Sequence, residues 1–395
     1  MLNKKMYALG ASRSVIRELF EYGKQLKAQI GEDKVYDFTL GNPSVPCPKE
    51  VDEYASYLIL NEPSVHAYTS ANGDIQTRKA IVDYNAKKYG FNLDENLIYM
   101  TCGAAASLKI VLSSILSEED EEILAIAPFF PEYRVFTETS GGTFKFVTCD
   151  EVNFSVNLIE LENSITPKTR GIIINSPNNP AGTVYDEETI KAISQILDKK
   201  QKEYGYPIYI IADEPYREIL FDGATCPYIP SFYDNTIICY SYSKALSLPG
   251  ERIGYIAISP KCENNKDLYL TVMGAGRALG YVCAPSLFQK VLAKHADKVS
   301  NPNPYKDNRD ILIETLTNLN FTCVNPKGAF YLFIKSPIPD AVEFSNHAKK
   351  YGLLLVPSDS FGVKGYLRLA TCVDKKTAVN SKDAFVLLAK EFNLI

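Results

Sequence analysis

The stretch Ser241-Tyr-Ser-Lys-Ala-Leu-Ser-Leu-Pro-Gly-Glu-Arg252 places a lysine, Lys244, among hydroxyl-bearing side chains directly after an apolar run. That run, Thr236-Ile-Ile-Cys-Tyr240, has the length and composition of a buried strand. A solvated surface lysine is not expected at the end of a buried strand, so Lys244 is a candidate for a desolvated, nucleophilic amine. For this stretch alone, a strand followed by a polar turn and a helix cap remains an equal alternative.

Groups that suit a phosphate flank this lysine. Ser241 and Ser243 offer hydroxyl donors, and Arg252 follows Lys244 in the same stretch with a fixed positive charge. A lysine beside a phosphate site is the pattern expected for pyridoxal 5′-phosphate (PLP) bound as a Schiff base. We therefore expect this stretch to hold that cofactor.

Short apolar runs alternate with helical stretches between about residues 96 and 259. This alternation predicts an α/β fold with a mostly parallel sheet covered by helices. Open sheets of this kind bind ligands at the carboxyl ends of their strands. The candidate residues at those ends are Gly103, Ala104, Ala105, Phe130, Asn179, Asp213 and Tyr216.

Three of these positions can be interpreted either as part of a cofactor site or as ordinary structural features. The small residues from Cys102 to Ser107 open a helix, where a phosphate can meet free backbone N–H groups. Phe130 stands between prolines and is placed to stack on a flat ring. Asp213 ends an apolar strand and needs a partner, for which a protonated pyridine nitrogen is suitable. The alternatives are a tight turn, a core aromatic side chain and a helix-capping aspartate.

The composition excludes several classes of protein. A chain of 395 residues with 46% hydrophobic residues suits a globular enzyme of two domains, and a net charge of −5 gives no support for nucleic-acid binding. Nine scattered cysteines without a CxxC pair favour reduced thiols, and three isolated histidines make a histidine-based metal site improbable. With no apolar run of membrane-spanning length, we expect a cytoplasmic protein.

The sequence Asn301-Pro-Asn-Pro304 marks a break near the start of a second unit. We expect residues 1–45 to form an N-terminal helix and arm that join a small domain. Residues 46–285 would form a large cofactor-binding domain and residues 286–395 a small α+β domain. Within the last unit, Tyr366-Leu-Arg368-Leu-Ala370 predicts a strand, whose arginine is either part of a surface ion pair or a buried carboxylate clamp.

In their order along the chain, these motifs resemble the class I/II aminotransferases of PLP fold type I, the aspartate aminotransferase superfamily. The resemblance covers nearly the whole chain, from the Gly41 loop to Arg368. The motifs that carry it are Tyr68 with Gly73, Gly103-Ala-Ala105, Pro128-x-Phe130-Pro-x-Tyr133, Asn179-Pro-x-Gly182, Asp213-x-x-Tyr216, Ser241-x-Ser-Lys244 with Arg252, Gly328-Ala-Phe-Tyr331 and Tyr366-x-Arg368.

The resemblance implies roles for the matching residues. Lys244 would form the Schiff base with the cofactor and act as the general base. Asp213 would pair with the pyridine nitrogen, and Phe130, where relatives more often carry tyrosine or tryptophan, would stack on the ring. Asn179 and Tyr216 would bond the phenolic oxygen of the ring. The phosphate would be held by Gly103, Ala104, Ala105, Ser241, Ser243 and Arg252.

The resemblance also implies a substrate site shared between two subunits. Arg368 would take the substrate α-carboxylate near Gly41 and Asn179. Tyr68 would reach the phosphate of the neighbouring subunit, so we expect a homodimer. In aspartate aminotransferases an arginine at a spacing like that of Arg277 crosses from the neighbour to grip a distal carboxylate. We therefore hypothesise aspartate or glutamate as one substrate, with a structural role for Arg277 as the alternative.

The expected activity is the transfer of an amino group between an L-amino acid and a 2-oxo acid by a ping-pong mechanism. C–S β-lyases and aminocyclopropane-carboxylate synthases use the same scaffold and remain alternatives. A PLP-binding transcriptional regulator is a weaker alternative, because it would need an added basic DNA-binding module for which these 395 residues leave no room.

Overall fold

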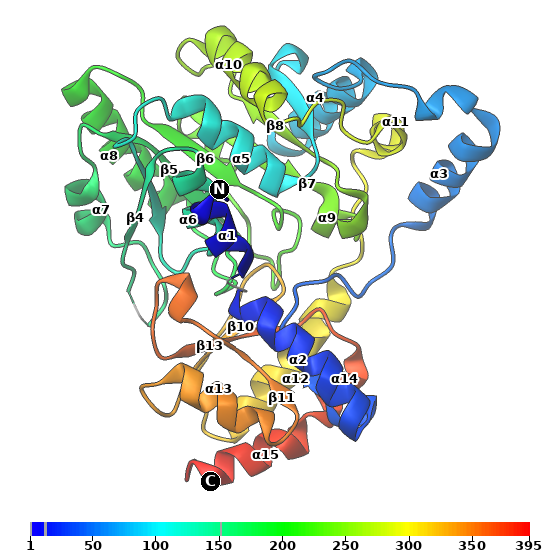
Figure 1. Ribbon diagram of the computed structural model, residues 1–395, viewed down its shortest axis with the longest axis vertical. Coiled ribbons are helices and arrows are strands. Elements are labelled where there is room, and N and C mark those ends of the chain that lie inside the picture. The colour runs from blue at the N-terminus through cyan, green and yellow to red at the C-terminus, as the bar shows by residue number, and fades with distance from the viewer. Residues whose placement is uncertain (1, 12–13, 151) are drawn as a thin grey trace.

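The largest element of the fold is a seven-stranded sheet with the strand order β2-β8-β7-β6-β5-β3-β4. The computed structural model describes residues 2–11, 14–150 and 152–395 (Figure 1). Strand β8 runs antiparallel to both of its neighbours, and β3 to β7 are parallel. The strands are β2 (Ile98–Thr101), β3 (Glu122–Ile126), β4 (Thr143–Val147), β5 (Thr169–Asn175), β6 (Tyr209–Asp213), β7 (Thr236–Ser241) and β8 (Gly254–Ile258). The predicted α/β class with a mostly parallel sheet is confirmed.

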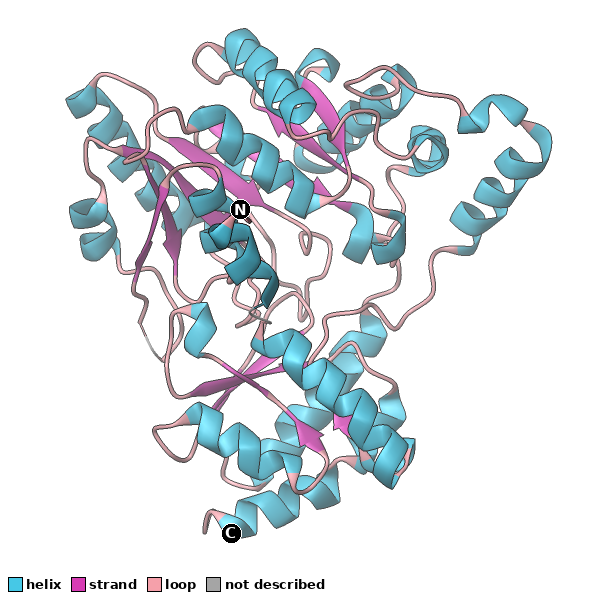
Figure 2. Cartoon of the chain, in the orientation of Figure 1, coloured by secondary structure: helices cyan, strands magenta, loops and turns pink. Residues whose placement is uncertain are grey.

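Helices cover both faces of this sheet (Figure 2). Ile173 and Ile211 pack on one face, whereas Ile172 and Ile210 pack on the other. Because both faces are covered, every residue of the inner strands β7 and β8 is buried, whereas the edge strand β4 keeps exposed polar residues such as Lys145. The covering helices are α4 (Ile75–Tyr89), α5 (Ala104–Ile115), α6 (Glu132–Thr139), α7 (Leu158–Ser164), α8 (Glu187–Tyr204) and α10 (Asn265–Ala278).

Two smaller sheets form the part of the molecule that carries the C-terminus, below the large sheet in Figure 1. Strands β9 (Cys323–Val324), β10 (Tyr331–Lys335), β12 (Val356–Pro357) and β13 (Tyr366–Ala370) form an antiparallel sheet in the order β12-β13-β10-β9. Strand β1 (Tyr36–Asp37) pairs in parallel with β11 (Leu353–Leu354), so the N-terminal region joins this part. The helices here are α2 (Val15–Ile30), α12 (Asn303–Asn318), α13 (Ala341–Lys349), α14 (Lys375–Asn380) and α15 (Lys382–Glu391).

Two helical regions refine the sequence-based expectations. Where one N-terminal helix was expected within residues 1–45, the structure has two, α1 (Lys4–Ala11) and α2, and residues 12–13 lie outside the described residues. Helix α11 (Ser286–His295) falls in the segment predicted as the small domain, but it packs against α3 (Lys49–Asn61) and α4. The division into domains stays a prediction. Within the described ranges, no helix combines the length and apolar character that a membrane crossing requires.

Candidate active site

A pocket of about 290 Å³ lies where strands β5, β6 and β7 end. Because parallel strands end at one edge of their sheet, residues far apart in the sequence meet there. The predicted site residues that line it are Gly41, Ala104, Ala105, Phe130, Asn179, Asp213, Tyr216, Ser241, Ser243, Lys244, Arg252 and Arg368.

Lys244 lies in the short helix α9 (Tyr242–Ala245), directly after β7, and is half-buried at the pocket. The Nζ atom donates a hydrogen bond of 2.6 Å to the carbonyl oxygen of Gly41. The pKa of Lys244 is lowered to about 8, chiefly by burial; Cys372 opposes this shift, and the positive charges of Arg252 and Arg368 contribute to it. A lysine with this pKa has a far larger neutral, nucleophilic fraction near neutral pH than a surface lysine.

Asp213 ends β6 and is 5% exposed. Its Oδ2 accepts a hydrogen bond from the hydroxyl of Tyr133, whereas its buried Oδ1 has no hydrogen-bond partner among the described residues. Burial raises the pKa of Asp213 to about 7, the charge of Glu214 adds to that effect, and the Tyr133 hydroxyl opposes it. A buried acceptor without a partner calls for a donor from a ligand. A protonated pyridine nitrogen of PLP fits this requirement.

The end of the pocket that is predicted to hold the phosphate is formed by the start of α5 and by the connection from β7 to β8. Gly103 caps α5 with a φ of 88°, and a Cβ atom at that position would lie 3.1 Å from Nη2 of Arg252. The hydroxyls of Ser241 and Ser243 lie 2.8 Å apart. A helix N-terminus, a guanidinium and two hydroxyls together form a suitable phosphate site.

Arg368 is supplied by β13 of the small antiparallel sheet and is 2% exposed. Its Nη1 donates to Oδ1 of Asn179 at 3.1 Å, and its Nη2 donates to the Thr39 carbonyl at 2.5 Å. The guanidinium also lies 4.6 Å from the ring centre of Tyr331. A surface ion pair is therefore excluded for Arg368, and these contacts fix its guanidinium at the pocket. The predicted binding of a carboxylate stays a prediction.

Tyr68 and Arg277 lie outside this pocket. Tyr68 follows the short helix η2 (Pro63–His66) and is 95% exposed. Arg277 is exposed in the last turn of α10. Both predicted roles require a second subunit, and both stay predictions.

Six further residues that line the pocket were not assigned roles from the sequence, among them Asn175, Tyr331 and Ile16. Asn175 ends β5 and hydrogen-bonds to two of the predicted site residues. Its Nδ2 donates to the Asp213 carbonyl at 2.8 Å, and its Oδ1 accepts from the Asn179 amide at 2.7 Å. The hydroxyl of Tyr331 lies 3.0 Å from that of Tyr216. Asn175 carries the same signal as Asp213, a polar residue ending an apolar strand. Ile16 has no such signal, because it reaches the pocket from the distant helix α2.

The family model for aminotransferase class I and II matches residues 33–380. The chain therefore belongs to this family, whose members use pyridoxal 5′-phosphate, and it is a PLP-dependent aminotransferase.

Individual proteins with similar sequences or structures are also aminotransferases. The chain is 31% identical over 366 residues to a probable aspartate aminotransferase from Methanocaldococcus jannaschii, with 90% of this chain and 92% of that protein covered. It is 29% identical to an aspartate aminotransferase from Pyrococcus horikoshii, with 93% of each covered. The crystal structure of an aminotransferase from Eubacterium rectale matches with a TM-score of 0.97 and 48% identity, covering 100% of this chain and 99% of that one.

Proposed function

We propose that this aminotransferase exchanges the amino group of an acidic L-amino acid, aspartate or glutamate, with a 2-oxo acid by a ping-pong mechanism. The observation that carries the proposal is one pocket lined by Lys244, Asp213 and Arg368. The aspartate aminotransferases among the relatives support an acidic substrate.

Bound PLP supplies an electron-withdrawing ring that takes up the electron pair of the bond broken at the substrate α-carbon. Arg368 binds the α-carboxylate with its planar donors and so fixes the α-carbon near Lys244. Asp213 would hold the ring nitrogen through its unpaired Oδ1 and keep that nitrogen protonated. The Lys244 amine would remove the α-proton as general base and deliver it as general acid to the cofactor instead of back to the substrate. The amino group would then stay with the cofactor while the 2-oxo acid leaves.

The shared site and the compartment belong to this proposal as well. Tyr68 from one subunit would complete the phosphate site of the other, and Arg277 would meet the distal carboxylate there. The high exposure of Tyr68 supports a homodimer, because an exposed tyrosine ring of this kind is available to a neighbour. All nine cysteines lie in the described part of the chain and none of them forms a disulfide, which supports a reducing compartment such as the cytoplasm.

The visible absorption spectrum of the purified protein tests the activity. We expect a band from the lysine-bound cofactor that bleaches on addition of L-glutamate or L-aspartate and returns on addition of a 2-oxo acid. A band that ignores both amino acids would reject an acidic donor. A protein that shows no band after incubation with PLP would reject the assignment of Lys244.

Arg277→Ala tests the choice of an acidic substrate. We expect KM for aspartate and glutamate to rise about tenfold or more, because one charge-assisted contact is lost, while kcat/KM for alanine stays the same. Lys266→Ala is the matched control, since Lys266 is an exposed cation at the other end of α10. Equal losses for alanine and aspartate would contradict a role in recognising the distal carboxylate.

A further inference from the structure

The turn that follows β6 has two functional faces. In the sequence Asp213-Glu-Pro-Tyr-Arg-Glu218, the residues Asp213, Pro215 and Tyr216 line the pocket. The intervening residues Glu214, Arg217 and Glu218 do not line it, yet their side chains are only 2–3% exposed. We call these three residues the rear cluster. One turn therefore carries both the predicted cofactor contacts and a buried group of charges behind them.

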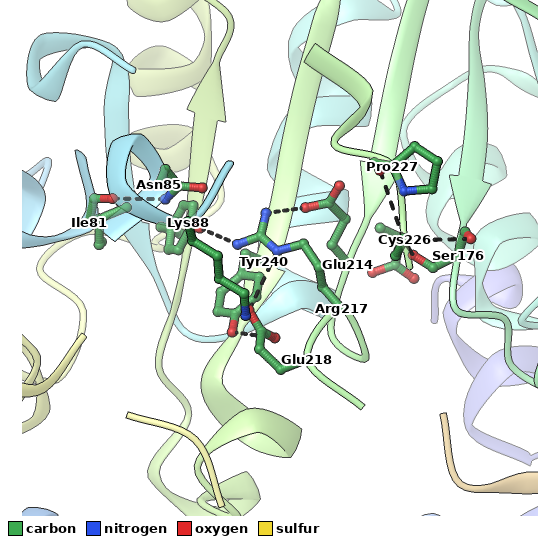
Figure 3. A network of polar contacts seen from close by, with 12 residues as sticks. Ile81, Asn85, Lys88, Ser176, Glu214, Arg217, Glu218, Cys226, Pro227 and Tyr240 are labelled. Carbon is green, nitrogen blue, oxygen red and sulfur yellow. Dashed lines mark hydrogen bonds and ion pairs between the residues drawn. The ribbon is translucent and has the colours of Figure 1, made fainter. Parts of the chain in front are cut away.

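Arg217 is the centre of the rear cluster. Its Nη1 lies 2.5 Å from Oε2 of Glu214, and its Nε lies 3.5 Å from Oε1 of Glu218. Figure 3 shows the guanidinium between these two carboxylates. Its central carbon also lies 4.7–5.3 Å from three tyrosine ring centres, those of Tyr89, Tyr228 and Tyr240. A planar guanidinium held by both charges and rings has little freedom to move.

Hydrogen bonds tie the rear cluster to the strands that carry the rest of the cofactor site. Tyr240 donates from β7 to Oε2 of Glu218 at 2.8 Å, and Ser241 directly follows it. Arg217 donates through Nη2 to the hydroxyl of Tyr255 on β8 at 3.3 Å. The same two strands flank the connection that contains Lys244 and Arg252. The rear cluster therefore joins the turn on the ring side of the pocket to the segment on the lysine and phosphate side.

Stability alone is a poor explanation for these buried charges. Moving an ion pair out of water has a large desolvation cost, and apolar replacements of similar volume are often as stable or more stable. A rigid network of charges and hydroxyls instead fixes the relative positions of the groups it connects.

We propose that Glu214, Arg217 and Glu218 are positioning residues that set Asp213 and Tyr216 at the correct distance from Lys244 and the phosphate groups, and thereby determine the affinity for PLP. The inference rests on the proposed cofactor contacts of Asp213 and Tyr216. It adds to them a second set of residues that touches neither cofactor nor substrate.

Substitution of Arg217 tests the inference through cofactor binding. We expect Arg217→Met to raise the Kd of the apo-protein for PLP about tenfold or more and to shift the visible band of the bound cofactor. Arg217→Lys should raise Kd less, because it keeps the charge and loses the planar fork. Equilibrium dialysis gives Kd, and absorption spectra report the surroundings of the ring.

Arg170→Met is the matched control. Arg170 also pairs with a buried glutamate, with Nε 2.6 Å from Oε1 of Glu121, and lies 4.4 Å from the ring centre of Tyr206. It lies near the start of β5, at the end of the sheet opposite the pocket. We expect this variant to lower the thermal midpoint while Kd for PLP stays within about twofold of the wild type.

Other variants keep the inference testable if Arg217→Met does not fold. Glu218→Gln keeps a hydrogen-bond acceptor for Tyr240 and removes one charge, so Arg217→Lys and Glu218→Gln would then decide. A Kd within about twofold of the wild type in both would overturn the inference. Asp213→Asn distinguishes a failure of the positioning role from a failure of the proposed cofactor contacts. Weak binding by Asp213→Asn with normal binding by the Arg217 variants would overturn only the positioning role, whereas normal binding by Asp213→Asn would overturn the proposed cofactor contacts too.

Discussion

At the scale of single residues, the surroundings of Lys244 and Asp213 change what ordinary side chains can do. Burial makes the lysine a better nucleophile and makes the aspartate a group that needs a donor. Neither effect requires an unusual residue, because both follow from placing a charged group at the buried end of a strand. The chemistry of the pocket is therefore set by position as much as by residue type.

The pKa of Lys244 predicts how the apo-protein takes up its cofactor. Only the neutral amine attacks the PLP aldehyde, so the rate of uptake should rise with pH through about 8 and then level off. Stopped-flow measurement of the visible band at a series of pH values checks this. A rate that keeps rising towards the ordinary lysine value of 10.5 would show that the amine is not desolvated.

Residue type and place in the sequence were sufficient to identify many of the pocket residues. Lys244 and Asp213 stand out because a charged side chain is exceptional at the end of an apolar strand. For Arg368 the strand pattern left a surface ion pair open, and only the family resemblance favoured the pocket. Ile16 was not recognised, because an apolar residue on an amphipathic helix gives no sign of which surface it meets. The contact between Tyr133 and Asp213 depends on tertiary packing, which no local pattern encodes.

At the scale of secondary-structure elements, the reversed strand β8 brings two site groups together. β7 ends, and antiparallel β8 begins, at the same edge of the sheet, so the connection between them returns without crossing the sheet. Lys244 and Arg252 both lie in this connection. The start of α5 faces the same connection, because Gly254 and Gly103 lie close together.

Gly103→Ala should weaken PLP binding by about tenfold or more, since a side chain at a φ of 88° is strained and its Cβ would crowd Arg252. The loss should be smaller for pyridoxal, which has no phosphate, so the ratio of the two Kd values is the measurement. Gly205→Ala is the control, because Gly205 has a φ of 81° and open space around it. An unchanged PLP-to-pyridoxal ratio in Gly103→Ala would remove this turn from the phosphate site.

The order of strands and helices along the chain was predictable from apolar runs in the sequence. Which of these elements pack against each other was harder to predict. The alternation from 96 to 259 indicated the parallel sheet, because buried strands have a strong compositional signal. The placement of α11 on α3 and α4 was not predictable, since an amphipathic helix near a break in the chain can pack against either side. The N-cap at Ser14, whose side chain accepts a hydrogen bond from the Arg17 amide at the start of α2, was not predicted. Helix α1 has no buried residue, so no apolar face distinguishes it from α2 in the sequence.

At the scale of the whole molecule, the pocket draws on segments from both ends of the chain. Gly41 comes from the N-terminal region, Lys244 from helix α9 directly after the large sheet's strand β7, and Arg368 from strand β13 of the small antiparallel sheet. The proposed contribution of Tyr68 would add a segment of a second molecule. The complete site is in that case a property of the dimer.

Co-expression of two defective chains tests this shared site. A dimer of one Lys244→Ala chain and one Tyr68→Ala chain contains one site with both residues intact, so we expect about half of the wild-type activity from purified mixed dimers. Each variant alone should be strongly impaired. Mixed dimers no more active than the Tyr68→Ala protein would show that Tyr68 acts within its own chain or not at all.

Arg368 lies on the small antiparallel sheet, whereas Lys244 follows a strand of the large sheet, and this separation has a consequence for the thermal stability of the enzyme. An amino acid held by its carboxylate at Arg368 and by its amino group near Lys244 would be a non-covalent cross-link between two separately built sheets. Such a ligand would stabilise the folded chain by mass action. The corresponding amine without a carboxylate would contact only the Lys244 side of the pocket, so we expect it to stabilise the fold less. A supply of substrate would then also protect the enzyme against heat and proteolysis.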